Sequence, residues 1–370
     1  MKTYKHLYPQ IYAWENLTEA FYKARKGKRS RPDVATFEFN LENEILSLNE
    51  ELATQTYQPG AYHSFYIREP KKRKISAAPF RDRVVHHALC RVIEPIWEAR
   101  FISDSYACRV GKGHHRALFR CTEFVRRYRY VLKCDIKQFF PSIDHAILRS
   151  LLARRIRDSD VMGLIDLILA SGVGLLVSEY TMQWFPGDDL MAALRPRGLP
   201  IGNLTSQFWA NVYLHQLDKF VKHSLHWLAY LRYSDDFLLF GDDKADLHGC
   251  RAAIADFLVP LRLRLHERKC VVFPTETGVD FVGFRVYPTH LRLRRDNVRR
   301  FVRRMRRLRT SYQKGEIDLD RVNASLQSWI AHSSYANTYN LRRRLFAQFV
   351  FAPPQKEHND ARITDFRQEL

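Results

Sequence analysis

The sequence lacks the long apolar segments by which membrane and secreted proteins are usually identified. No run of apolar residues reaches the roughly 18 that a membrane-spanning helix requires. The N-terminal residues Met1 to His6 lack the apolar core of a signal peptide. We therefore expect a cytoplasmic protein without a membrane partner.

Cysteines are few and scattered. The chain has 6, and no two of them form a Cys-X-X-Cys pair. Because zinc sites usually use closely spaced cysteines, a zinc site is not expected. The thiols are instead expected to be reduced and mostly buried.

Acidic residues are scarce relative to basic ones. The 370 residues include 60 lysines and arginines but 40 aspartates and glutamates, which gives a net charge of +20. This excess indicates a polyanionic partner, and nucleic acid fits it better than a membrane surface. At 46% hydrophobic residues, the chain is long and apolar enough for a large core in two or three subdomains.

Residues 228–240 contain two apolar, aromatic-rich runs on either side of a short polar break. This pattern predicts a buried β-hairpin with Ser234, Asp235 and Asp236 at its tip. Adjacent carboxylates beside an apolar sheet repel each other and are costly to desolvate unless a cation neutralises them. Hard oxygen ligands favour Mg²⁺ or Mn²⁺, so a divalent-metal site is expected, with a solvated turn as the alternative.

A second short apolar run begins at Val131 and predicts a strand that ends near Asp135. If the two strands lie side by side, Asp135 and Asp235 come together. Two-metal phosphoryl transfer needs carboxylates that bridge ions about 4 Å apart. Asp135, Asp235 and Asp236 are therefore candidate catalytic residues and metal ligands.

Two further aspartate pairs, Asp188-Asp189 and Asp242-Asp243, have a different context. The first follows Pro186-Gly187, and neither pair has apolar runs on both sides. Both are expected to be turns without catalytic function.

The hairpin and the upstream Asp135 resemble the palm of a reverse transcriptase, in which a Tyr-X-Asp-Asp hairpin joins one earlier aspartate. The resemblance extends from about Tyr57 to Leu341. In that family, group II intron and many viral enzymes have Gln where Ile201 stands. The Ile form of this segment is similar to the reverse transcriptases of diversity-generating retroelements. The segments that carry the resemblance are 70–75, 79–85, 104–113, 198–207, 230–240, 281–284 and 328–341.

The resemblance implies an α+β fold, a right-hand polymerase with fingers, a palm and a thumb. Residues 1–118 are expected to form the fingers. Residues 119–290 are expected to form the palm, an antiparallel sheet with helices that includes segments contributed to the fingers. Residues 291–350 are expected to form a helical thumb, and the polar residues 351–370 a flexible tail.

The resemblance also implies roles near the metals. The backbone carbonyl of Ile136 is expected to be a metal ligand. Arg73, with Lys72 as second choice, is expected to contact the incoming triphosphate from a mobile basic hairpin; a plain charged turn is the alternative. Phe140 is expected to lie against the sugar and to exclude a ribose 2′-hydroxyl, unless it is simply a core residue.

Three further assignments depend on their neighbourhood. Ile201 and Gln207, from the segment that opens a helix, are expected to lie near the nucleotide. Lys269 follows an alternating segment, residues 261–265, that predicts a strand. It is a candidate general acid for the departing pyrophosphate, although an ordinary surface lysine is an equal alternative. Gly283 is expected to allow a close backbone approach to the primer.

A basic helix follows. An apolar stripe over residues 298–312 predicts this helix, with Asp296 or Asn297 as cap and Gly315 as stop. Acidic residues are nearly absent nearby, so a salt-bridged solvated face is a poor explanation of its arginines. A contact with the template–primer duplex is expected. The candidate contacts are Arg299, Arg303 and Arg307.

These observations predict DNA synthesis on a retroelement RNA template, with two Mg²⁺ ions for which Mn²⁺ can substitute. The expected partners are template RNA, cDNA or primer, deoxynucleoside triphosphates and a small basic accessory protein. Copying is expected to be error-prone and to serve sequence diversification. The alternatives are a prokaryotic reverse transcriptase of phage defence and a non-catalytic RNA-binding scaffold. The intact set of three aspartates argues against the scaffold.

Overall fold

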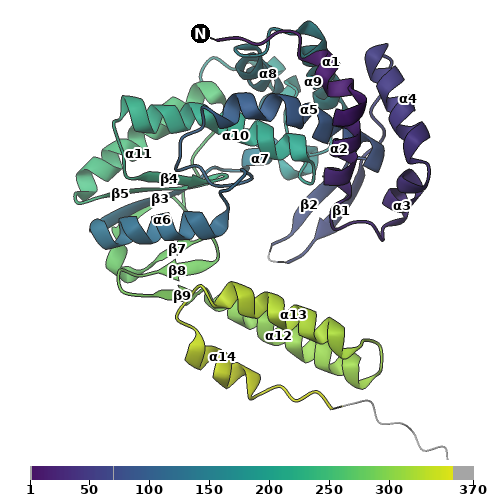
Figure 1. Cartoon of the computed structure of the whole chain (residues 1–370). Coiled ribbons are helices and arrows are strands. Elements are labelled where there is room, and N and C mark those ends of the chain that lie inside the picture. The colour runs from purple at the N-terminus through teal and green to yellow at the C-terminus, as the bar shows by residue number, and fades with distance from the viewer. Residues whose placement is uncertain (1, 70, 353–370) are drawn as a thin grey trace, which may run out of the picture. The chain divides into compact units, whose positions relative to one another are not determined.

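The computed structural model describes residues 2–69 and 71–352 and divides into two compact units at Thr275/Glu276 (Figure 1). This boundary precedes residue 291, where the thumb was expected to begin, because three short strands fall within the second unit. The expected tail lies outside the described residues from Pro353 onward, as does Pro70. In the described ranges, no helix combines the length and the apolar character needed to cross a membrane.

The first unit combines helices with antiparallel sheet, as expected. Its helices are α1 (Tyr8–Tyr12), α2 (Trp14–Arg25), α3 (Pro32–Phe39), α4 (Leu41–Ala53), α5 (Phe80–Glu98), α6 (His114–Arg127), α7 (Phe139–Ser142), α8 (His145–Ala153), α9 (Ser159–Ser171), α10 (Leu204–Lys219) and α11 (Lys244–Leu258). Its strands are β1 (His63–Ile67), β2 (Arg73–Ala77), β3 (Tyr130–Asp135), β4 (Tyr230–Tyr233), β5 (Asp236–Gly241) and β6 (Val271–Pro274).

The central sheet has the order β4-β5-β3-β6, with every neighbouring pair antiparallel. Helix α11 lies against one face of the sheet and α6 against the other (Figure 1). The residues of β5 alternate between these environments: Phe237 belongs to the main core, whereas the Phe240 ring packs on Phe124 of α6. Both faces are therefore covered, which explains why β4 and β5 read as nearly continuous apolar runs.

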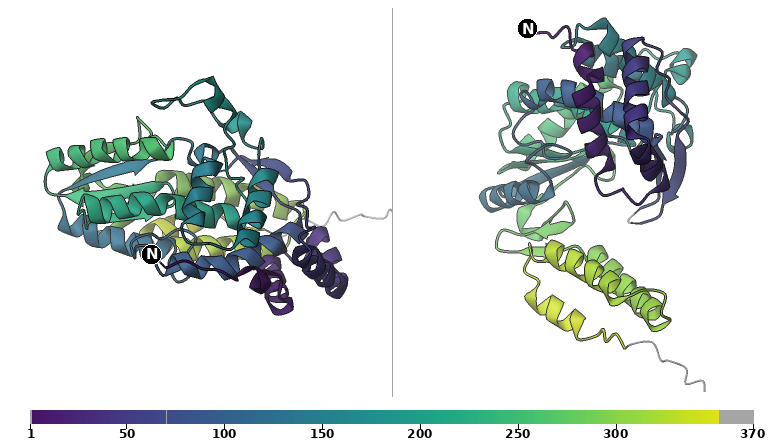
Figure 2. Two further views of the ribbon diagram at one scale, coloured as in Figure 1. Left: turned by 90° about the horizontal axis from the view of Figure 1, so that it is seen from above. Right: turned by 45° about the vertical axis from the view of Figure 1, so that its right-hand side comes forward.

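The N-terminal helices pack around α5, the long helix that also contacts α10 (Figures 1 and 2). Apolar residues of α5 such as Val84, Leu89 and Ile93 are completely buried. Strands β1 and β2 form a separate antiparallel hairpin whose first strand is exposed along its whole length. The segment before Gln55 consists mainly of helices, and all six cysteines are free thiols, of which Cys108 is exposed.

The strand expected at residues 261–265 is wrong. The segment begins with a short 3-10 turn, and Arg262 then adopts a left-handed conformation with φ 53°. That conformation breaks the pleat, so only Leu265 pairs with Ile136 as an isolated bridge. The arginine is fixed there because its guanidinium binds both carboxylate oxygens of Asp188, at 2.7 and 2.8 Å.

The second unit contains a three-stranded antiparallel sheet followed by helices. Its strands are β7 (Val279–Phe281), β8 (Phe284–Val286) and β9 (Leu291–Leu293), and its helices are α12 (Arg295–Gln313), α13 (Leu319–Ser333) and α14 (Tyr339–Phe346). The Phe301 ring of α12 stacks on Trp329 of α13 at 3.8 Å. This aromatic contact and the burial of Met305 account for the apolar stripe seen in the sequence.

The ends of α12 follow the sequence only in part. Gly315, with φ 72°, ends the helix as expected. Its N–H donates to the carbonyl of Tyr312, and the N–H of Glu316 donates to the carbonyl of Ser311. The expected start is wrong, because α12 begins at Arg295 without a side-chain cap. Asn297 lies inside the first turn of the helix, where its Oδ1 accepts a hydrogen bond from Trp329 Nε1 at 2.9 Å.

Candidate active site

Backbone pairing brings the candidate carboxylates together. Strand β3 ends at Asp135 and β5 begins at Asp236, and the register places these two residues directly opposite each other. Tyr233 pairs with Asp236 across the β4–β5 hairpin, so its two-residue turn consists of Ser234 and Asp235. The predicted hairpin and its position beside Asp135 are therefore both present.

The cluster is costly in electrostatic terms. Burial, supported by repulsion from Asp135, raises the pKa of Asp235. Burial also raises the pKa of Asp236 to about 6, although the nearby Lys133 opposes the shift. Among the described residues, no hydrogen-bond partner reaches the buried Oδ1 atom of Asp236. An orphaned carboxylate oxygen beside two other carboxylates suits a hard divalent cation.

Two lysines partly neutralise the cluster. Lys269 Nζ lies 2.9 Å from Asp135 Oδ1, and Lys133 Nζ lies 3.6 Å from Asp236 Oδ2. The first contact places Lys269 beside the carboxylates, and its role as a general acid stays a prediction. Lys133 was missed in the sequence, although its position two residues before Asp135 on a strand puts both side chains on one face.

The carbonyl of Ile136 is directed toward the same edge. The N–H of Lys137 donates to the carbonyl of Arg264, and the carbonyl of Asp135 accepts from the N–H of His266. Both groups therefore point toward the segment that leads into β6. Successive residues of a strand direct their polar groups to opposite sides. The Ile136 carbonyl therefore faces the β5 side, where Asp235 and Asp236 lie.

A small cavity of about 20 Å³ adjoins the hairpin turn. Ser234, Phe140 and Gln207 all line it, so the structure brings the last two beside the first residue of the hairpin turn. Phe140 is partly buried and packs against the main core, so the structure describes the core contact of this ring and leaves its contact with a sugar as a prediction. Gln207 is exposed on the first turn of α10.

Ile201 lies in the loop before α10, where its backbone contacts the β1–β2 hairpin. Its carbonyl accepts a hydrogen bond from Ser76 of β2 at 2.9 Å. Asn203 continues this link: its side chain donates to Ser76 and accepts from the N–H of Ala78. The side chain of Asn203 thus holds β2 in place.

The basic hairpin contributes charge at two positions. Arg73 lies near enough to Asp235 to lower the pKa of that carboxyl, against the larger effect of burial. Lys72 is exposed, with its Nζ 4.6 Å from the centre of the Tyr66 ring. Lys74 instead donates to the carbonyl of Leu175, so it has a structural role. Of these three basic side chains, Arg73 is the one whose charge acts on a carboxylate of the cluster.

The other two aspartate pairs are turns, as expected. Asp188 binds Arg262 and accepts a hydrogen bond from Phe185, and Asp243 caps α11. The carboxylates of Asp188 and Asp243 are satisfied by protein groups, in contrast to Asp236 Oδ1.

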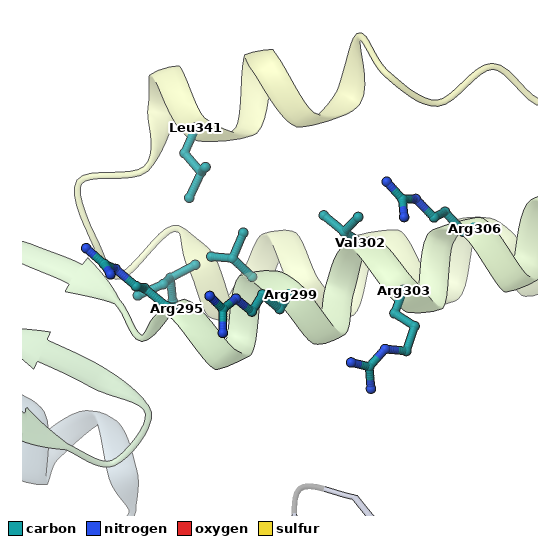
Figure 3. Close-up of a pocket in the computed structure, with 8 residues that line it drawn as sticks. Arg295, Arg299, Val302, Arg303, Arg306 and Leu341 are labelled. Carbon is teal, nitrogen blue, oxygen red and sulfur yellow. The ribbon is translucent and has the colours of Figure 1, made fainter.

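The second unit carries the remaining candidates. Val282 and Gly283, with φ 39° and 92°, form the β7–β8 turn, where a side chain at position 283 would be strained. Arg299, Arg303 and Arg307 are exposed on α12. Figure 3 shows Arg299 and Arg303 projecting from α12 beside an open groove of about 560 Å³, which Leu341 of α14 also lines.

Comparison with known proteins gives the family. The model of the reverse transcriptase (RNA-dependent DNA polymerase) family matches residues 67–286, which is more than half of the chain and includes all three carboxylates. The chain belongs to the reverse transcriptase family. It is therefore an RNA-directed DNA polymerase.

Named relatives of this reverse transcriptase include intron-encoded proteins. Protein YkfC of Escherichia coli is 27% identical over 288 residues, 66% of this chain and 71% of that protein. The group II intron-encoded protein LtrA of Lactococcus lactis is 30% identical over 183 residues, 49% of this chain but 28% of LtrA. The nuclear intron maturase 2 of Arabidopsis thaliana is 31% identical over 149 residues, 36% of this chain and 20% of that protein. These relatives support kinship with group II intron proteins.

The raised pKa of Asp236 predicts an unusual pH dependence of the metal-free protein. A carboxyl with a folded pKa of about 6 keeps its proton more tightly in the folded state, so it costs stability as pH rises from about 4 through 6. Asp236→Asn should therefore raise the free energy of unfolding in EDTA at pH 7 by about 1–2 kcal/mol, allowing for solvent screening.

Thermal or urea unfolding of both proteins at pH 4 and pH 7 checks this. At pH 4 the two should differ little in stability beyond the effect of the substitution itself. The burial argument would be contradicted if the gain in unfolding free energy from Asp236→Asn were no larger at pH 7 than at pH 4.

Proposed function

We propose that this reverse transcriptase extends a DNA strand on a retroelement RNA by two-metal phosphoryl transfer. The observation that carries the proposal is the set of three partly buried carboxylates at the ends of β3 and β5, with an orphaned oxygen on Asp236. When bound, two Mg²⁺ ions would activate the primer hydroxyl and neutralise the leaving pyrophosphate, and Mn²⁺ could substitute for them.

Each protein group has a defined task in this proposal. Asp135, Asp235, Asp236 and the Ile136 carbonyl would bind the ions. Lys269, which lies against Asp135, donates a proton to the departing pyrophosphate.

Four side chains are assigned to the incoming nucleotide. Arg73 and the exposed Lys72 bind the triphosphate of the incoming deoxynucleotide, Phe140 blocks a 2′-hydroxyl, and Gln207 contacts the nucleotide. These roles are supported by the charge of Arg73 near Asp235 and by the cavity that Phe140, Gln207 and Ser234 share.

We assign the right-hand divisions accordingly, with fingers at 1–118, palm at 119–290 and a helical thumb at 291–350. In the thumb, Arg299, Arg303 and Arg307 contact the template–primer duplex, and Gly283 allows the primer strand to approach the backbone. The exposure of these arginines on one helix and the excess of basic residues in the chain support this assignment.

We further infer an error-prone enzyme of the diversity-generating type that works with a small basic accessory protein. Ile201 supports this subtype, because an aliphatic side chain cannot make the hydrogen bonds that Gln makes in many reverse transcriptases.

Asp235→Asn tests the metal site. The neutral amide binds Mg²⁺ poorly, so DNA synthesis should fall on the order of 10³-fold or more while the fold is retained. Primer extension by the purified variants measures this. Asp189→Asn removes an equal charge from a turn outside the site and should extend primers normally. Near-normal synthesis by Asp235→Asn would refute the assignment.

Charge reversal tests the thumb. Arg303→Glu with Arg307→Glu should weaken template–primer binding and reduce the slope of log affinity against log salt by about 2, because fewer counterions are released. Filter binding at several salt concentrations measures the slope. Lys5→Glu with Arg157→Glu changes net charge equally on an exposed part of the first unit and should leave it unchanged. Equal slopes for both double variants would return α12 to an ordinary solvated surface.

Ile201→Gln tests fidelity. A restored polar contact should sense mispaired geometry, which is worth about 1–2 kcal/mol or roughly 5- to 30-fold in selectivity. Misincorporation opposite template adenine should fall, as measured by sequencing cDNA from one RNA template. Ile201→Val, which stays aliphatic, should keep the wild-type error spectrum. If Ile201→Gln also keeps that spectrum at comparable extension, Ile201 has no part in fidelity.

A further inference from the structure

Arg232 is a completely buried charge on β4, two residues before the hairpin turn. A guanidinium has five N–H donors, and here every one of them has an acceptor. The acceptors are Asp218 Oδ1 and Asp218 Oδ2 at 2.7 Å each, Asn211 Oδ1 at 3.1 Å, Ser105 Oγ at 3.0 Å and the Ser234 carbonyl at 3.0 Å.

The ion pair with Asp218 does not by itself explain this arrangement. Both side chains are fully buried, and Tyr230 donates a further hydrogen bond to Asp218 at 2.7 Å. A buried ion pair usually stabilises a fold no more than apolar side chains of the same volume would. Its rigid geometry, rather than its energy, is the feature that calls for an explanation.

The guanidinium is fixed from two other parts of the fold. Asp218 and Asn211 belong to α10, and Ser105 belongs to the segment that pairs with β4. The backbone of Arg232 is held as well, since its N–H donates to Asp104 and its carbonyl accepts from Tyr106, at 2.9 and 3.0 Å. Because the backbone of Arg232 and its other N–H groups are held in this way, the guanidinium can act as a rigid hydrogen-bond donor to the turn.

Ser234, whose carbonyl accepts this hydrogen bond, has a strained backbone conformation. Ser234 has φ 58°, a conformation that a residue other than glycine adopts at a cost and keeps when its surroundings enforce it. The Ser234 carbonyl belongs to the planar peptide bond that joins Ser234 to Asp235, the second residue of the turn. Any shift of the turn therefore moves the Asp235 carboxylate.

We propose that Arg232 is a positioning residue, which fixes the Ser234 carbonyl from the core and so holds the Asp235 carboxylate in the orientation that binds metal. The inference rests on the proposed metal site. Arg232 has no contact with substrate in this role. It transmits the rigidity of α10 to the tip of the hairpin.

Arg232→Lys is the decisive variant. Lysine keeps the charge near Asp218 but has no planar fork, so it cannot bind Asp218, Ser105 and Ser234 at once. Tyr230→Phe is the matched control, because it removes a buried hydrogen bond to Asp218 from the same network without touching the turn. Asp218→Asn is a second test, because it keeps the size of the side chain but disrupts the bidentate contact.

Three measurements separate positioning from simple loss of stability. They are the melting temperature, Mn²⁺ affinity by electron paramagnetic resonance without nucleic acid, and steady-state kinetics with template–primer. In Arg232→Lys, Mn²⁺ affinity should fall about 5-fold or more and kcat about 10- to 100-fold, while KM for the deoxynucleotide changes less than about 3-fold. Tyr230→Phe should melt at a lower temperature but keep Mn²⁺ affinity and kcat within about 2-fold of wild type.

The outcomes are distinct. A folded Arg232→Lys protein with wild-type Mn²⁺ affinity and kcat overturns the proposal, as do equal losses in Tyr230→Phe at an equal drop in melting temperature. If Arg232→Lys does not fold, Asp218→Asn decides by the same criteria. If Asp235→Asn binds Mn²⁺ as tightly as the wild type does, the metal site and this inference are both overturned. Binding that Asp235→Asn abolishes and Arg232→Lys preserves overturns only the role of Arg232.

Discussion

Antiparallel pairing between β3 and β5 forces three carboxylates together against their mutual repulsion. The backbone register sets Asp135 opposite Asp236, and the two-residue turn adds Asp235. The sheet supplies the energy for this, since its buried aromatic and aliphatic side chains gain far more on folding than the carboxylates lose. The cost shows as raised pKa values of Asp235 and Asp236, and a divalent cation would relieve it.

Helix α10 is the element that connects the parts of this site. At its start, Asn203 holds β2 of the basic hairpin, and Gln207 borders the cavity beside the turn. One turn further along, Asn211 contacts Arg232, and Asp218 pairs with the same guanidinium. A single buried helix thus fixes the hairpin that bears Arg73 and the hairpin that bears Asp235. This explains why so many of its side chains, polar ones included, are buried.

The second unit uses different physics. Its core is small, built on contacts such as the stacked pair Phe301 and Trp329, and the exposed surface of α12 is dominated by arginine. Arginines on one helix bind phosphates through charge, with little demand for precise placement. The carboxylate site needs positions fixed within fractions of an ångström, whereas such a helix needs mainly charge density. The family match reaches Val286, so it includes the first two strands of this unit.

The sequence by itself determined the chemistry: three aspartates in apolar strand contexts, the blocks of a reverse transcriptase, the hairpin with Asp235 at its tip, and the basic helix. These signals are local, because periodicity and turn residues act over a few positions. The tertiary structure decided what depends on distant partners. Residues 261–265 alternate like a strand but bend at Arg262, which binds Asp188, and Asn297 lies inside α12, where it accepts a hydrogen bond from Trp329 of α13. Arg232 is a charged residue within a buried strand, and its partners on α10 and at position 105 meet it only when the chain is folded. Contacts between segments far apart in sequence leave no periodic trace, so only the folded chain could reveal them.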